Sequence, residues 1–122
     1  MKRILSVLVL AVCMVAINAC YWDNPPEPIP IDPEMISFQT HIIPIFNASC
    51  NSTGCHDDTY APDLREENAW RELHSGYVNL TFPEESRIYT SVENGYMPPG
   101  GSLTETEKEL ILGWVIKGAL ND

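Results

Sequence analysis

Basic residues are scarce in this chain. Seven lysines and arginines stand against 17 aspartates and glutamates among 122 residues, so the formal net charge is −10. Such a surface repels the phosphates of nucleic acids and of anionic lipid headgroups, and we expect no nucleic-acid binding. The negative charge either keeps the protein soluble or favours a basic protein partner.

Long apolar runs are also lacking, apart from one near the N-terminus. Lys2 and Arg3 precede about 14 mostly apolar residues, which suit a signal peptide and are too few to span a membrane comfortably. Residues 17–20, INAC, resemble a bacterial lipobox, in which the cysteine receives lipid. We therefore expect a lipoprotein signal peptide at residues 1–19 and lipidation of Cys20. An ordinary cleaved signal or a buried structural helix are the alternatives.

A proline-rich segment follows the expected signal peptide. Residues 21–33 hold five prolines and three acidic residues, with no periodic apolar pattern. This composition favours an extended polyproline conformation of roughly 3 Å per residue, which would hold a domain away from a membrane. We expect a linker at residues 20–34 and one small folded domain at residues 35–122.

The domain has no convincing strand pattern and no internal repeat. Apolar side chains recur at helical spacing over residues 37–47, with Ser37 as the N-cap, although Pro44 must kink or interrupt this helix. Shorter helices are expected at residues 64–74 and 87–92. The pattern predicts a small, all-α domain with a loop-rich middle.

The last helix has the clearest signal. Thr104 and Glu107 match a capping box, and the apolar face that follows includes Trp114. Gly113 and Gly118 lower helix propensity, so we expect them to allow close packing against another helix or a flat ligand. Large aliphatic side chains are few between the first and last helices. Domains this small often need a disulfide, a metal or a cofactor to complete the core.

Cysteine is sparse in the domain, and its two cysteines lie close together. Cys50 and Cys55 are followed at once by His56 in residues 50–56, CNSTGCH. Two cysteines before a histidine are typical of covalent haem attachment, in which the thiols form thioethers and the imidazole binds the iron. The usual spacer has two residues and this one has four, where Gly54 allows a tight backbone. A disulfide or a zinc site is the alternative use of the pair.

A haem iron bound by His56 needs a sixth ligand from elsewhere in the domain. Methionine is scarce there, since only Met35, at the linker boundary, and Met97 remain. Met97 lies in residues 95–101, GYMPPGG, where the following proline favours an extended conformation and two prolines stiffen the loop. We expect Met97 to be the sixth ligand, with His74 in reserve.

Several segments resemble class I c-type cytochromes of the small, exported bacterial kind. They are residues 37–56 (SFQTHIIPIFNASCNSTGCH), 83–89 (PEESRIY), 97–101 (MPPGG), 103–107 (LTETE) and 114–119 (WVIKGA), in that order, and the resemblance covers about residues 36–120. It implies that the first and last helices cross around one haem c. It also implies thioethers at Cys50 and Cys55, with His56 and Met97 as axial ligands.

The resemblance extends to residues around the ligands. It implies that the carbonyl of Pro62 orients the proximal histidine. Arg87, Trp70 and Tyr89 are further candidates for contact with the haem propionates.

These observations predict a monohaem c-type cytochrome that carries single electrons between redox proteins. It would be lipid-anchored outside the cytoplasmic membrane, in the periplasm or cell envelope. No acid–base pair is evident, so we expect an electron-transfer protein rather than an enzyme. The alternative is a haem-free binding or structural module with a Cys50–Cys55 disulfide on a cytochrome-like scaffold.

Overall fold

The computed structural model describes residues 30–122. The expected signal peptide, the lipidation at Cys20 and most of the linker lie outside these residues. Within them every regular element is helical and no strand is present, which confirms the prediction of an all-α domain. None of the helices in this part is long and apolar enough to cross a membrane.

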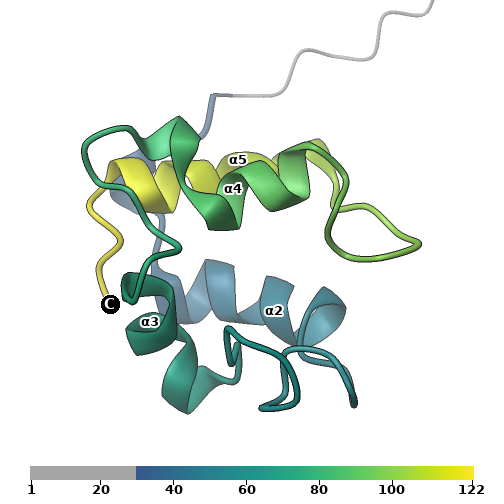
Figure 1. Cartoon of the computed structure of the whole chain (residues 1–122). Helices are drawn as coiled ribbons and strands as arrows, with labels where there is room; N and C mark the ends of the chain where they lie inside the picture. The colour runs from purple at the N-terminus through teal and green to yellow at the C-terminus, as the bar shows by residue number, and fades with distance from the viewer. Residues whose placement is uncertain (1–29) are drawn as a thin grey trace, which may run out of the picture.

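The helices form two layers (Figure 1). One layer contains α4 and α5, which pack side by side, and the other contains α2 and α3. In chain order the elements are η2 (Pro33–Met35), η3 (Phe38–Ile42), α2 (Ile43–Ser49), α3 (Glu66–His74), η4 (Pro83–Glu85), α4 (Arg87–Glu93) and α5 (Glu105–Ile116).

The first helical segment begins as expected and changes pitch at its proline. The hydroxyl of Ser37 accepts a hydrogen bond from the Thr40 amide at 3.2 Å, which caps η3. The amide of Ile43 then bonds the carbonyl of Phe38, five residues back, so the first turn is a wide π-turn. Pro44 lies in the first turn of α2, directly after η3, and offers no amide to the carbonyls of the preceding turn. Regular α-helical bonding is thus interrupted next to Pro44, as expected, although the chain stays helical through residues 38–49.

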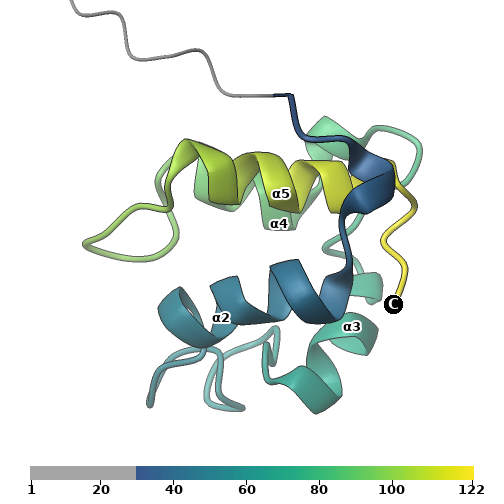
Figure 2. The same cartoon turned by 180° about the vertical axis from the view of Figure 1, so that it is seen from behind.

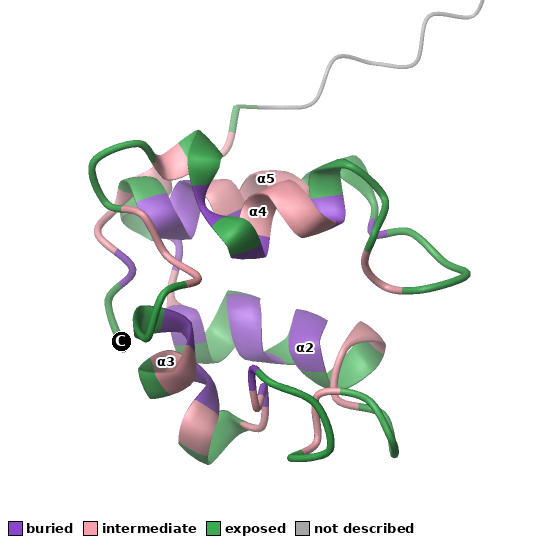
Figure 3. Cartoon of the chain, viewed as in Figure 1, coloured by how far each residue is buried: buried purple, intermediate pink, exposed green. Residues whose placement is uncertain are grey.

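Aromatic rings join the two layers. The rings of Phe38 and Trp114 stack with centroids 4.9 Å apart, and Phe46 meets Phe38 edge-on at 6.3 Å. All three side chains are fully buried. Figure 3 shows buried residues on the facing sides of the layers. The other buried apolar side chains include Ile36, Ile42, Ile43, Ile45, Leu64, Leu73, Ile88, Val92, Leu103, Ile111 and Val115.

The capping box of α5 is confirmed. The Thr104 amide donates to Glu107 Oε2 at 2.7 Å, and the Glu107 amide donates to Thr104 Oγ1 at 3.3 Å. The expected packing use holds for Gly113, where an added Cβ would lie 2.4 Å from Ile36 Cδ1. Gly118 serves the helix end instead, because its φ of +109° is a conformation that side chains disfavour.

The last residues are bonded to the start of η3. Ser37 Oγ donates to the Asp122 carbonyl at 2.8 Å, and the Phe38 amide donates to Asp122 Oδ1 at 3.0 Å. Lys117 donates to the Ile36 carbonyl at 2.8 Å and pairs with Asp122. These contacts tie both ends of the domain together, at the opposite end of α2 from its loop of cysteines (Figure 2).

Candidate haem-attachment site

The cysteine loop begins where α2 ends. The amides of Cys50 and Asn51 both bond the carbonyl of Phe46, at 2.9 and 3.0 Å, which closes the last turn of the helix. The Asn51 side chain donates to Asn47 Oδ1 at 2.7 Å and so bonds the loop to the helix surface. Cys50 is half-buried and packs against the core. The first cysteine is therefore held by the helix that precedes it.

The four-residue spacer folds back on itself. The Cys55 amide donates to the Ser52 carbonyl at 2.9 Å, which makes residues 52–55 a tight turn. Gly54 has a φ of +83°, and nothing lies within 4 Å of the position its Cβ would take. The His56 amide then donates to the Cys50 carbonyl at 3.2 Å. The two extra residues are thus absorbed in the turn, and the backbone of His56 returns to Cys50.

An aspartate beside the histidine holds this turn. Asp57 Oδ2 accepts from the Gly54 amide at 3.0 Å, and Oδ1 accepts from the Thr59 amide at 3.3 Å. Hydrogen bonding from the Thr59 side chain, and then from the amides of Gly54 and Thr59, holds the pKa of Asp57 below its usual value. The sequence analysis missed this residue, although an aspartate in a turn-rich segment commonly accepts from the amide two residues further on, as Asp57 does from Thr59.

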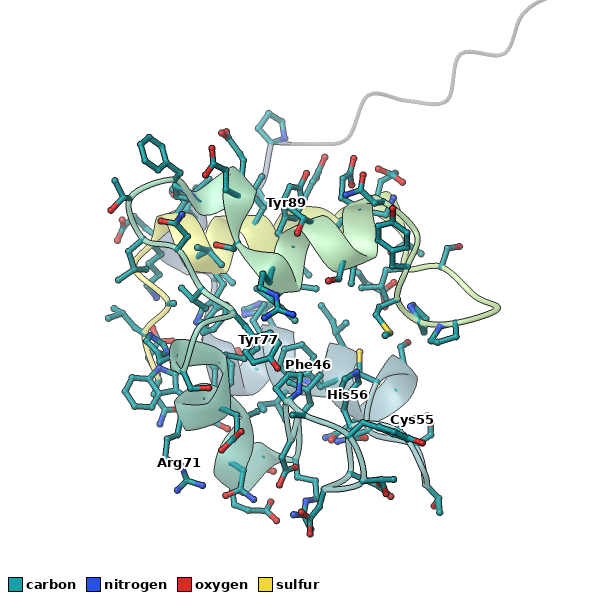
Figure 4. All side chains as sticks on the ribbon, in the orientation of Figure 1. Phe46, Cys55, His56, Arg71, Tyr77 and Tyr89 are labelled. Atoms are coloured by element: carbon teal, nitrogen blue, oxygen red, sulfur yellow. The ribbon has the colours of Figure 1, made fainter. Side chains whose placement is uncertain are left out.

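The imidazole of His56 has one nitrogen committed to hydrogen bonds. Its Nδ1 lies 2.9 Å from the Pro62 carbonyl and 3.2 Å from the Tyr60 carbonyl. Because both partners are acceptors, Nδ1 carries the proton and Nε2 keeps its lone pair. A histidine oriented in this way through a backbone carbonyl is the form that ligates metals. Figure 4 labels His56 and Cys55 together at the end of α2.

The segment that carries the Pro62 carbonyl is itself anchored. Pro62 and Leu64 are buried, and the Leu64 amide donates to the His56 carbonyl at 2.8 Å. Between them, Asp63 accepts from Arg65 Nη2 at 2.6 Å and from Asn68 Nδ2 at 2.7 Å. The hydrogen bonds from Arg65 hold the pKa of Asp63 far below its usual range. The ion pair between Asp63 and Arg65 therefore holds the segment that orients His56.

Met97 lies in the loop between α4 and α5. Its amide donates to the Ser91 carbonyl at 3.0 Å, and its side chain is half-buried against the core. The Gly101 amide donates to the Pro98 carbonyl at 3.2 Å, which closes a turn after Met97. In Figures 1 and 2 this loop and the cysteine loop lie at the same end of the molecule. Residues 50–56 and Met97 are thus brought to one end.

The two layers also influence each other electrostatically at this end of the domain. The pKa of the Cys50 thiol is raised to about 11, chiefly by burial and then by the negative charges of Glu107 and Cys55. Glu107 lies in the first turn of α5, so the start of that helix is near the first cysteine. Cys50 and Cys55 are both free thiols, the second of them exposed.

The other candidate residues lie elsewhere or have other partners. His74 Nδ1 bonds the Trp70 carbonyl at 2.8 Å, and the two rings lie 4.4 Å apart. The Trp70 indole donates to the Ala119 carbonyl at 2.8 Å, which leaves that donor satisfied. Met35 is 74% exposed on η2. In the view of Figure 4, Tyr89 lies on the upper side of α4 and Tyr77 below it.

Arg87 is the propionate candidate that keeps its charge available. Its guanidinium carbon lies 4.8 Å from the centre of the Tyr77 ring, and the Ile88 amide bonds the Tyr77 carbonyl at 3.1 Å. Within residues 30–122 no carboxylate approaches Arg87 to ion-pair distance, whereas the other four cationic residues there are paired.

The described residues hold no cluster of metal ligands, and a cavity on the α3 side lies apart from the cysteine loop. In the part of the chain that the structure describes, no three or more His, Cys, Asp or Glu side chains are grouped to hold a metal ion. A cavity of about 300 Å³ lies on the α3 side, with Asp58, Tyr60, Ala61, Asp63, Arg65, Asn68, Arg71 and Glu72 around it. Its charged groups largely neutralise one another, and it adds no ligand to the cysteine loop.

The residue types at this end of the molecule are those that a haem c site would need. They are two thiols, an imidazole whose Nε2 is left outside its hydrogen bonds and, in the α4–α5 loop, a thioether. Comparison of the chain with protein-family models, with curated proteins and with solved structures finds no match.

Proposed function

We propose that the protein is a monohaem c-type cytochrome that carries single electrons. The observation that carries the proposal is the bond from His56 Nδ1 to the Pro62 carbonyl, next to the two thiols. It leaves Nε2 as a ligand of fixed tautomer and orientation, which a structural histidine beside a disulfide would not require.

The cysteines would attach the cofactor covalently. Each thiol would add across one vinyl group, with the sulfur bonding one carbon and the thiol proton going to the other. The reaction needs no oxidant, because no electrons leave the pair of reactants. Burial and the charge of Glu107 keep Cys50 protonated at neutral pH, so its thiol is protected from adventitious oxidation before attachment.

Met97 would complete the coordination from the facing layer. A thioether opposite an imidazole favours the reduced state and raises the potential relative to two histidines. With both axial positions filled by protein, haem would supply a one-electron couple and no open site for oxygen chemistry. The contact between η3 and α5 through Phe38 and Trp114 supports a cytochrome-like arrangement of the first and last helices.

The surface around the two loops supports a protein partner of opposite charge. Residues 51–56 and 94–104 contain no Asp, Glu, Lys or Arg, whereas Asp57, Asp58, Glu93 and Glu105 border them. An uncharged centre with a charged rim is the usual anatomy of a transient interface, and here it suits a redox protein with a basic rim. Lipidation of Cys20 and the linker at residues 20–34 would hold the domain near a membrane in the periplasm or cell envelope.

Arg87 would bind the carboxylates of the cofactor. A guanidinium over an aromatic face, free of carboxylate partners in an acidic domain, can accept a propionate as its counter-ion. Trp70 is the weaker candidate, since its indole already donates to Ala119.

Expression together with a haem-maturation system tests the proposal. The purified chain is denatured and its haem content and mass are measured, alongside Cys50→Ala, Cys55→Ala and the double variant. We expect denaturation-resistant haem in the unmodified chain, a single thioether in each single variant and none in the double variant. A chain without a Soret band and with a mass two protons below the reduced form supports the haem-free disulfide module instead.

A further inference from the structure

To bind one haem through both cysteines, the chain must hold the two thiols at one particular separation. The vinyl groups of one haem lie at a fixed separation, while a spacer of four residues can place two thiols at many separations. Each additional loop residue adds conformational freedom that attachment must remove. Something in the chain should therefore hold the spacer in one compact form.

Asp57 makes the contacts that would do this. Its carboxylate accepts from Gly54 inside the spacer, at 3.0 Å, and from Thr59 beyond the histidine, at 3.3 Å. One side chain thus joins the segments on both sides of His56. It acts on the Ser52–Cys55 turn, which the backbone bond from the Cys55 amide to the Ser52 carbonyl closes at 2.9 Å.

The backbone next to Asp57 has an unusual conformation that keeps these contacts in place. Asp58 has a φ of +90°, which a residue other than glycine seldom adopts. Arg65 contacts Asp58 at 3.5 Å, with 76% of the Asp58 side chain exposed. The turn after His56 returns to the end of the spacer, since the Tyr60 amide donates to the Cys55 carbonyl at 3.0 Å.

We infer that Asp57 is a positioning residue that folds the four-residue spacer so that both Cys50 and Cys55 can reach one haem. The inference rests on the proposed function. Asp57 itself would not contact the cofactor. Asp57 would act through its hydrogen bond to the Gly54 amide and the turn at residues 52–55.

Haem attachment in the full chain gives the first test, with Asp57→Ala and the charge-matched control Asp58→Asn. The fractions with two, one and no thioethers are measured by mass and by the pyridine haemochrome band, which shifts to longer wavelength when a vinyl group stays free. We expect Asp57→Ala to lower the two-thioether fraction several-fold and Asp58→Asn to leave it near the unmodified value.

Shortening the spacer separates this role from a general effect on folding. Deleting Thr53 and Gly54 restores a two-residue spacer and removes the amide that Asp57 holds. In that background Asp57→Ala should change the two-thioether fraction little. An equal loss in both backgrounds overturns the inference while leaving the haem protein itself intact.

Hydrogen exchange supplies a readout that does not depend on haem. In the haem-free chain the Gly54 amide should exchange at least several-fold faster after Asp57→Ala, with the helical circular dichroism unchanged. An unchanged exchange rate overturns the inference. Failure of the proposed function looks different, because then the unmodified chain itself acquires no haem under maturation.

Discussion

The two loops that lie at the same end of the domain are held in different ways. Residues 50–64 carry a dense local network, in which His56 alone is bonded through its amide, its carbonyl and Nδ1. Residues 94–104 have fewer bonds, with Met97 held through its amide and by packing. The proposed proximal ligand, His56, is therefore preorganised by its own segment, and the position of the proposed distal ligand, Met97, depends on how the α4–α5 layer packs on α2.

The difference teaches which half of the site should tolerate change. Preorganisation by short-range hydrogen bonds survives small shifts between layers, whereas a ligand on a loop between helices follows every such shift. We expect the proximal side to decide whether haem is retained and the distal side to tune its ligation and potential.

The largest predicted contrast is between the two axial ligands. His56→Ala should abolish accumulation of the haem protein, since no other imidazole in residues 30–122 shares the Pro62-oriented position. Met97→Ala should keep covalently bound haem but lose the sulfur charge-transfer band and shift the potential downward. Haem staining of denatured protein and visible spectra measure both.

His74→Ala is the matched control for that contrast, because His74 packs on Trp70 and should leave the spectra unchanged. Equal loss of haem in the Met97 and His56 variants contradicts the division of roles between the loops.

The second-largest effect is expected at Asp63, which anchors the segment that carries the Pro62 carbonyl. Asp63→Asn should lower the free energy of unfolding by about 1–2 kcal/mol at pH 7, because Arg65 loses a charged partner that is only 14% exposed. Since the folded-state pKa of Asp63 is depressed, this stabilisation is fully present above the ordinary aspartate pKa, ~4, declines below it and is lost as pH falls through the folded-state pKa.

Urea unfolding of both chains at pH 7 and pH 3 measures the effect. Glu67→Gln is the control with the same change in charge, since Glu67 is 67% exposed and lies 3.9 Å from Arg65. A difference between the chains that stays constant over this pH range argues against an anchoring charge at Asp63.

Substitutions in the layer of α4 and α5 should change the reduction potential of the proposed haem more than the stability of the fold. Arg87→Gln removes a positive charge from the proposed propionate contact, which favours the oxidised haem. We expect a fall of up to about 59 mV, a tenfold change in the one-electron equilibrium. Potentiometric titration measures it, with Arg71→Gln on α3 as the charge-matched control. A potential that moves equally in both variants rules out a specific contact at Arg87.

The smallest effect separates the two cysteines of the haem-free, reduced chain. Cys55 is exposed and should be alkylated first, while Cys50 is half-buried with a pKa raised to about 11. Its alkylation should therefore rise with pH up to that value, and peptide masses report both sites. Equal rates for the two thiols at pH 7 would contradict the burial of Cys50 at the end of α2.

Local signals in the sequence predicted much of the fold. The capping box at Thr104, the N-cap at Ser37 and the interruption at Pro44 each depend on residues within one helical turn. The hydrogen bonds that Asp122 accepts at the start of η3 join residues more than 80 positions apart, and no local sequence pattern predicts them.

The candidate site could also be predicted in part from the sequence. The thiols and His56 follow from their spacing, and the bond to Pro62 agrees with what the resemblance implied. The role of Asp57 could not be read from its acidity, because most aspartates in so acidic a chain are simply solvated. Only the turn geometry identifies which carboxylate faces Gly54.

The most direct measurement is the mass and absorption spectrum of the denatured, matured protein. The account predicts one haem per chain, bound through Cys50 and Cys55, and a pyridine haemochrome spectrum of the c type. A chain that matures without haem, its two thiols joined as a disulfide and no Soret band in its spectrum, would contradict it.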